Sequence, residues 1–153
     1  DVVLVEEEAI AAAMLLMLER KKILAEGSGA AALAALMTGR VALAPGSRAG
    51  LVVSGGNVDT PLLGRILGKG LLKKGRVMRL RVRLDDIPGA LAGLLATVAR
   101  LKANVLHIYH DRSIKDISIL TTDVELELET RGEAHVAEIA AALRSMGYDL
   151  KIR

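Results

Sequence analysis

The chain has 153 residues, 52% of them hydrophobic, with no Cys, Phe or Trp and a formal net charge of +3. That length suits one ordinary domain or two small ones, and the lack of cysteine excludes disulfides and thiolate metal sites and fits a cytoplasmic protein. The small net charge gives no sign of a nucleic-acid partner.

The first half of the chain alternates short apolar runs with helical patterns. We expect strands at residues 2–5, 23–26 and 51–53, and helices at residues 6–22, 30–37 and 60–67. The first helix opens on three glutamates, which suit the positive end of the helix dipole, and it is apolar nearly all round, so it should be buried on most sides. Its uninterrupted apolar run is shorter than the roughly 20 residues that a membrane span requires. Residues 69–75, rich in glycine and lysine, are interpreted as a linker.

From Arg76 the pattern changes to one of longer alternating strands. We expect strands at residues 78–84, 103–111, 117–129 and 148–153, a hairpin loop at 112–116, and helices after the first and third strands. The order βαββαβ predicts an α+β fold, a ferredoxin-like sandwich with two helices on one face of an antiparallel sheet.

Two charged rows share a parity in this half, and the first and third strands are neighbours in such a sheet. We therefore predict that the arginines face the glutamates on the exposed side and fix the register. The rows are Arg79, Arg81 and Arg83, and Glu125, Glu127 and Glu129. The apolar phase of the third strand shifts near Ile117 and Ile119, which indicates either a bulge or, as we favour, a covered subunit interface.

Two turns are candidate binding sites. The expected strand at 51–53 runs into Ser54-Gly-Gly-Asn57, which delivers a hydroxyl and open backbone to a sheet end, where ligands of α/β sheets collect. In the second half, Gly89 allows close backbone approach, and the N–H groups of Ala90 and Leu91 open a helix and suit a carboxylate. The alternative is that Pro88-Gly89 forms a turn without a binding role. In that case Asn104 is present only because asparagine tolerates an unfavourable backbone conformation. His107 and His110 face opposite sides of a strand, so we expect no metal there.

Asp86-Ile-Pro-Gly-Ala-Leu91 and Ala-Asn-Val at 103–105 resemble the ACT domain, a βαββαβ module that binds amino acids. The resemblance implies a homodimer, with a tetramer as a further state, and an effector between two subunits with Asn104 beside its amino group. Isoleucine or valine is the expected effector. The implied effector-binding residues are Asp86, Pro88, Gly89, Ala90, Leu91, Asn104 and Val105. Some such domains serve only as assembly surfaces, and that alternative stays open.

The remaining motifs resemble the end of the catalytic domain of pyridoxal-phosphate (PLP) threonine ammonia-lyases in the form with one ACT domain. They lie at residues 5–8, 18–21, 25–30, 54–59 and 129–135. The resemblance implies that residues 1–68 end a fold-type II α/β PLP domain and that 76–153 form the ACT regulatory domain. It also implies that Ser54 bonds the PLP pyridine nitrogen, that Glu26 lies near the ring, and that Gly55 and Gly56 let the backbone pass close. Otherwise Ser54 is a turn residue and Glu26 caps a helix.

The family's Schiff-base lysine and phosphate loop have no counterpart in this sequence. We expect its lysines before Arg76 to be solvated at a helix end or in the linker. The resemblance therefore implies the C-terminal part of a longer lyase, inactive alone, that deaminates threonine under feedback from an amino acid. The alternative is a stand-alone ACT-type module that senses an amino acid or dimerises without catalysis. An RNA-binding βαββαβ domain needs aromatic side chains on its central strands, which are absent here.

Overall fold

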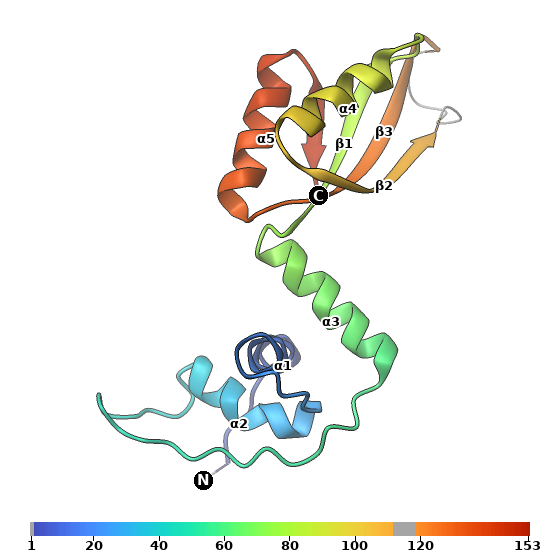
Figure 1. Cartoon of the computed structure of the whole chain (residues 1–153). Coiled ribbons are helices and arrows are strands. Elements are labelled where there is room, and N and C mark those ends of the chain that lie inside the picture. Colours follow the sequence, from blue (N-terminus) through green and yellow to red (C-terminus); the bar gives the residue numbers. More distant parts are fainter. Residues whose placement is uncertain (1, 112–118) are drawn as a thin grey trace. The chain divides into compact units, whose positions relative to one another are not determined.

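The computed structural model describes residues 2–111 and 119–153. The chain divides into two compact units, one ending at Gly70 and one comprising Leu71–Arg153 (Figure 1). Helix α1 (Glu7–Lys21), helix α2 (Gly27–Met37) and most of helix α3 (Thr60–Lys73) belong to the first unit. No helix among the described residues combines the length and the apolar character that a bilayer crossing demands.

Helices α1 and α2 pack together around a core of aliphatic and small side chains. Its buried members are Ala13, Met14, Leu15, Met17, Ala25, Ala30, Ala34 and Ile66. The strands expected at residues 2–5, 23–26 and 51–53 do not form, so that prediction is wrong for this structure. A β-strand requires a series of backbone hydrogen bonds to a neighbouring strand. Among the described residues the second and third segments are joined near their ends by a single backbone bond, from Glu26 N–H to the Gly55 oxygen.

Two helix boundaries in the first unit also differ from expectation. Helix α2 begins at Gly27 rather than residue 30, and α3 continues to Lys73 through the glycines that suggested a linker. Gly70 explains the second difference, because a Cβ at that position would collide with the Leu15 side chain of α1. Glycine therefore lets α3 approach α1 closely, and its presence marks packing rather than the end of the helix.

The second unit is a helix-backed antiparallel sheet, as the sequence predicts. Its elements are β1 (Val77–Asp85), α4 (Ala90–Arg100), β2 (Asn104–Asp111), β3 (Thr121–Glu129), α5 (Glu133–Ser145) and β4 (Asp149–Ile152). The sheet order is β2-β3-β1-β4, and all three neighbouring pairs are antiparallel. Both helices cover one face of the sheet (Figure 1). Alternate residues of β1 and β3, including Leu80, Val82, Leu126 and Leu128, form the core with Leu94, Val98 and Ile139.

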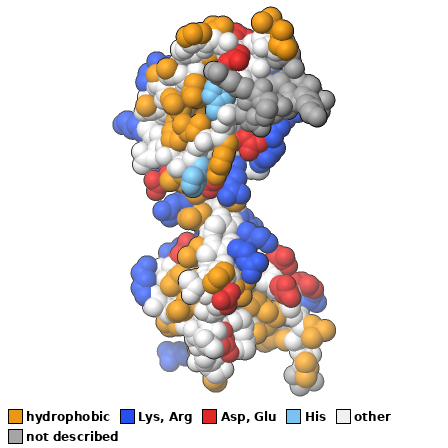
Figure 2. Space-filling model, turned by 90° about the vertical axis from the view of Figure 1, so that its right-hand side faces the viewer, with side chains coloured by type: hydrophobic (Ala, Val, Ile, Leu, Met, Phe, Trp, Pro, Cys, Tyr) orange, Lys and Arg blue, Asp and Glu red, His pale blue; other side chains and the backbone are white. Residues whose placement is uncertain are grey.

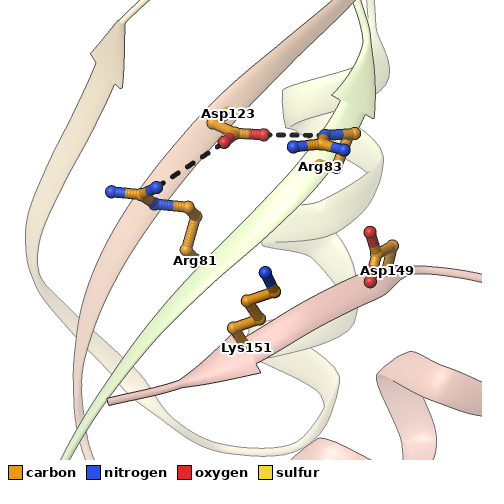
Figure 3. A pocket seen from close by; sticks show the side chains of 5 residues that line it. All are labelled: Arg81, Arg83, Asp123, Asp149 and Lys151. Carbon is orange, nitrogen blue, oxygen red and sulfur yellow. Dashed lines mark hydrogen bonds and ion pairs between the residues drawn. The ribbon is translucent and has the colours of Figure 1, made fainter. Parts of the chain in front are cut away.

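The opposite face of the sheet carries the predicted ion pairs, with one change of partner. Arg79 lies opposite Glu127 and Arg81 opposite Glu125, as expected, but Arg83 lies opposite Asp123. Figure 3 shows the Asp123 carboxylate between Arg81 and Arg83. The Asp123 side chain is only 5% exposed, and its hydrogen bond and charge raise the pKa of Arg83. Glu129 lies opposite Val77 on β1, so no arginine of the row lies opposite it. It accepts a hydrogen bond from Asn104 instead.

The parity shift expected in the third strand falls before the strand that forms. Strand β3 begins at Thr121, and Ile119 belongs to an exposed turn before it, so Ile119 is not a strand residue, and whether a second subunit covers it stays a prediction. The pairing of β3 with β1 is regular, and the irregularity recorded in the sheet lies in β2, between Val105 and His107. Ile117 and the hairpin loop expected at 112–116 lie outside the described residues.

Candidate functional site

The first candidate site joins residues 25–29 to residues 54–56, and we refer to it as the turn-pair site. The Glu26 N–H donates to the Gly55 oxygen at 3.2 Å. A Cβ on Gly29 would lie 2.8 Å from the Ser54 carbonyl oxygen, and a Cβ on Gly56 would lie 3.1 Å from the Leu24 oxygen. Glycine at position 29 is therefore needed for the two backbone segments to approach, and a larger residue at position 56 would require the Leu24 oxygen to move by a few tenths of an ångström.

The Glu26 carboxylate lies over Gly55. A Cβ on Gly55, whose φ is +82°, would lie 2.7 Å from that carboxyl group, so this glycine makes room for Glu26. Glu26 occupies the N-cap position of α2 but makes no capping bond with its carboxylate. The carboxylate instead accepts a hydrogen bond from the Ser28 hydroxyl at 2.5 Å. Sequence reasoning missed Ser28, whose hydroxyl reaches the Glu26 carboxylate because both residues lie at the start of α2.

The Ser54 hydroxyl is exposed and has no hydrogen-bond partner within the described residues. It is available to a ligand that approaches the turn-pair site. The lysines before Arg76 are all exposed, whereas a lysine that carries a cofactor covalently is usually desolvated or placed beside another cation. They are Lys21, Lys22, Lys69, Lys73 and Lys74.

The second candidate site is the turn from β1 to α4. Gly89 stands at the N-cap of α4 with φ +91°, a conformation that favours glycine, although no atom of the described residues lies within 4 Å of an added Cβ. The Ala90 N–H, expected to be free, donates to the Ile87 oxygen at 3.3 Å. The Leu91 N–H makes no backbone bond within the described residues, so it stays available to an anion.

Asn104 and the β1–α4 turn lie at opposite ends of the sheet in one chain. Asn104 begins β2, where it pairs with Glu129 and donates to the Glu129 carboxylate at 3.2 Å. Since β1 and β2 both pair antiparallel with β3, they run in the same direction, and the turn follows the far end of β1. Nine residues of strand separate the two ends by roughly 25 Å. The expected effector residues do not form one site within a single chain.

Strand β2 is an edge of the described sheet and presents apolar side chains. Its exposed members are Val105 (39%), Leu106 (43%), Ile108 (39%) and Tyr109 (62%). Figure 2 shows orange side chains gathered on this unit beside the pale-blue histidines. His107 lies opposite Glu127 and His110 opposite Val124, so the two histidines face opposite sides, as predicted. Within residues 2–111 and 119–153, no group of three His, Asp or Glu side chains is arranged to hold a metal ion.

Comparison with known proteins gives strong matches over nearly the whole chain. The chain is 47% identical over 148 residues to an L-threonine ammonia-lyase of Geobacter sulfurreducens, covering 97% of this chain and 37% of that protein. It is 44% identical over 152 residues to an L-threonine ammonia-lyase of Thermotoga maritima, covering 99% of this chain and 37% of that protein. An ACT domain-containing protein of Lachnoclostridium phytofermentans is 34% identical over 79 residues, covering 52% of this chain and 53% of that protein.

Other comparisons are weaker. No family model matches the chain. A prephenate dehydratase structure from Staphylococcus aureus aligns with a TM-score of 0.40 and 15% identity over 50% of this chain and 28% of that one, a likeness too low to bear on function. The chain spans little more than a third of the length of the lyases that it matches. It is homologous to the C-terminal part, about 37%, of L-threonine ammonia-lyases.

Proposed function

We propose that this chain is the C-terminal part of a PLP-dependent L-threonine ammonia-lyase, which converts L-threonine to 2-oxobutanoate and ammonia. The observation that supports the proposal most strongly is 47% identity to a lyase of that name over 97% of the chain. In this proposal residues 1–68 end the catalytic domain and residues 76–153 form an ACT-type regulatory domain.

The turn-pair site offers groups that fit one edge of the cofactor ring. PLP, when bound, withdraws electrons from the amino acid and so favours loss of the β-hydroxyl. Ser54 presents an exposed hydroxyl that no other described residue binds, which suits a hydrogen bond to the pyridine nitrogen. A neutral hydroxyl leaves that nitrogen largely unprotonated, whereas a carboxylate would hold a proton on it. Ser28 holds the Glu26 carboxylate in place, and Glu26 closes the site beside Gly55.

The anchoring lysine and the phosphate loop belong, in this proposal, to the part of the parent enzyme that precedes these residues. Supporting observations are the exposure of every lysine before Arg76 and the exposed apolar side chains of the segments expected to be strands. Val2 is 92% exposed, and Leu4 and Val52 are each 83% exposed. Neighbouring strands of a complete sheet would cover such side chains. This chain alone is therefore expected to be inactive.

We further propose that the second unit binds an amino acid between two copies, with isoleucine or valine as effector. Antiparallel pairing of β2 with a second β2 would satisfy the open edge and cover its apolar side chains. Such pairing places the start of one β2 beside the end of the other, and so moves Asn104 toward the β1–α4 turn of the other copy. The Leu91 N–H would then meet the effector carboxylate, and Asn104 would meet its amino group.

A second candidate function is an ACT-type module that assembles or senses without catalysis. The similarity to an ACT domain-containing protein half covered by this chain supports it. Isothermal calorimetry of the chain with isoleucine, valine, serine and threonine tests the sensing role. Saturable heat with isoleucine or valine is expected, and no heat with any of the four amino acids would contradict it.

The lyase role is tested in the parent protein with Ser54→Ala and, as a matched control, Ser47→Ala, another exposed serine. Loss of one hydrogen bond to the cofactor should lower kcat at least about tenfold for Ser54→Ala. Ser47→Ala should retain wild-type kcat. Equal activity of both variants would refute the role of Ser54.

A further inference from the structure

Basic side chains gather at the end of the second unit where β1 and β2 begin and β3 ends. A cavity of about 490 Å³ opens there, within the roughly 300–1,000 Å³ typical of small-molecule sites. Its lining residues are Arg76, Lys102, Asn104, Glu129, Thr130 and Arg131. Arg76 directly precedes β1, Lys102 and Asn104 lie in the α4–β2 turn and at the start of β2, and the other three residues lie at the end of β3 and in the β3–α5 turn. We refer to this cavity as the basic cavity.

The charges of the basic cavity are unbalanced. Arg76, Lys102 and Arg131 contribute three positive charges and Glu129 one negative charge, so the net charge is +2. Glu129 accepts a hydrogen bond from Asn104, while Arg76 and Lys102 have no side-chain hydrogen bond or ion pair within the described residues. Two cationic head groups are therefore free to bind an anion.

The turns that present these cations are tied together. Arg131 donates from Nη1 to the Lys102 oxygen at 3.2 Å, and its backbone N–H donates to His135 Nδ1 at 3.1 Å. Because Nδ1 accepts, His135 is the neutral tautomer that donates from Nε2 to the Leu101 oxygen, at 2.8 Å. His135 is 4% exposed, so this link between the two turns is shielded from water. These bonds hold the backbone of the two turns in a fixed relation, and so fix where the Lys102 and Arg131 side chains begin.

Lys102 has an unusual backbone for a residue other than glycine. Its φ is +59°, in the left-handed region that few non-glycine residues adopt. The conformation ends helix α4 in the usual way, since the Lys102 N–H donates to the Ala99 oxygen at 2.9 Å and the Ala103 N–H donates to the Val98 oxygen at 3.3 Å. These bonds, together with the Arg131 guanidinium at its carbonyl oxygen, hold the backbone of Lys102 in place.

We propose that the basic cavity binds a dianionic phosphate group, as inorganic phosphate or as a phosphate monoester. The net charge of +2 matches a dianion, and the arginine forks and the lysine ammonium suit its oxygens. Within one chain the cavity lies at the opposite end of β1 from Leu91, and it shares only Asn104 with the residues proposed to bind the amino acid, so the proposal rests on Arg76, Lys102 and Arg131 and not on the amino-acid site.

The test is a titration of the full chain with sodium phosphate at pH 7.5, monitored by the amide chemical shifts in NMR spectra. Phosphate replaces sodium chloride during the titration, so that the ionic strength stays constant. Wild type should show saturable shifts at residues 76, 102 and 131. Lys102→Gln and Arg76→Gln should each weaken binding at least about tenfold, the effect of one lost hydrogen bond to a charged group. Lys151→Gln, a lysine in a separate pocket with Arg81 and Arg83, is the matched control and should bind like wild type.

Two outcomes would overturn the proposal: no saturation by phosphate in wild type, or equal weakening by all three variants, which indicates general charge screening. A parallel titration with glycerol 3-phosphate distinguishes the two sources, since tighter binding than phosphate indicates a monoester ligand. Isoleucine titrations of the same variants separate this proposal from the amino-acid site. Lost phosphate binding with retained isoleucine binding, or the reverse, assigns failure to one site alone.

Discussion

The substitution Gly75→Ala tests the close packing of a residue just before β1 against the backbone at the start of α5. Gly75 has φ +60°, and an added Cβ would lie 2.6 Å from the Glu133 nitrogen and 2.8 Å from the Gly132 carbonyl carbon. Those atoms are backbone and cannot rotate away. The Gly75 oxygen also accepts hydrogen bonds from the Gly132 N–H and the Thr130 hydroxyl, so a local shift would weaken both. The left-handed backbone costs an alanine about 1–2 kcal/mol, and the collision costs a further 1–3 kcal/mol.

A loss of about 3 kcal/mol should lower the Tm of a unit this size by about 12–24 °C. Tyrosine fluorescence is a selective assay, since the chain has no Trp and both tyrosines, Tyr109 and Tyr148, lie in the second unit. Gly147→Ala is the control, because Gly147 has φ +87° but no atom near the added Cβ. It should lose about 4–8 °C, the effect of the backbone conformation alone at about 1 kcal/mol. If Gly75→Ala melts no lower than Gly147→Ala, the steric argument is wrong.

Three further predictions concern contacts of the second unit. Asp123→Asn removes the carboxylate that Arg81 and Arg83 share. Because the two arginines are partly exposed, the free energy of unfolding measured in urea should fall by about 1 kcal/mol. The control Asp149→Asn should change this free energy by less than half as much. His135→Ala breaks both ring hydrogen bonds and should cost about 2 kcal/mol in the same assay; an unchanged midpoint would show that the link is dispensable. Ile108→Lys places a charge on the apolar β2 edge and should turn the proposed dimer into a monomer in light scattering; a dimer that persists would exclude this edge as the interface.

The second unit could be predicted from the sequence because local and global signals agree there. In β1, Leu80 and Val82 alternate with arginines, and the structure buries one set and exposes the other. Register was harder to predict. The sequence offered Glu129 as the third partner of the arginine row, but pairing is fixed by the whole β1–β3 ladder, which places Asp123 opposite Arg83.

The first unit shows why local pattern can mislead. Val52 belongs to an apolar run that suits a strand, yet no neighbouring strand is present among the described residues to complete a ladder. Gly70 suggested a linker because its contact with Leu15 is long-range and invisible in a local window. The turn-pair site was foreseen through Ser54 and Glu26, while Ser28 was missed because its role depends on the geometry at the start of α2.

We propose that these residues belong to a PLP enzyme whose anchoring lysine lies on another part of its chain. The direct measurement is to purify the parent protein from its source, and to record its intact mass, its visible absorbance and its production of 2-oxobutanoate from threonine. We expect a yellow, threonine-consuming protein of about 400 residues, the length at which 148 aligned residues make 37%. A colourless protein no longer than 153 residues, without activity toward threonine, would contradict it.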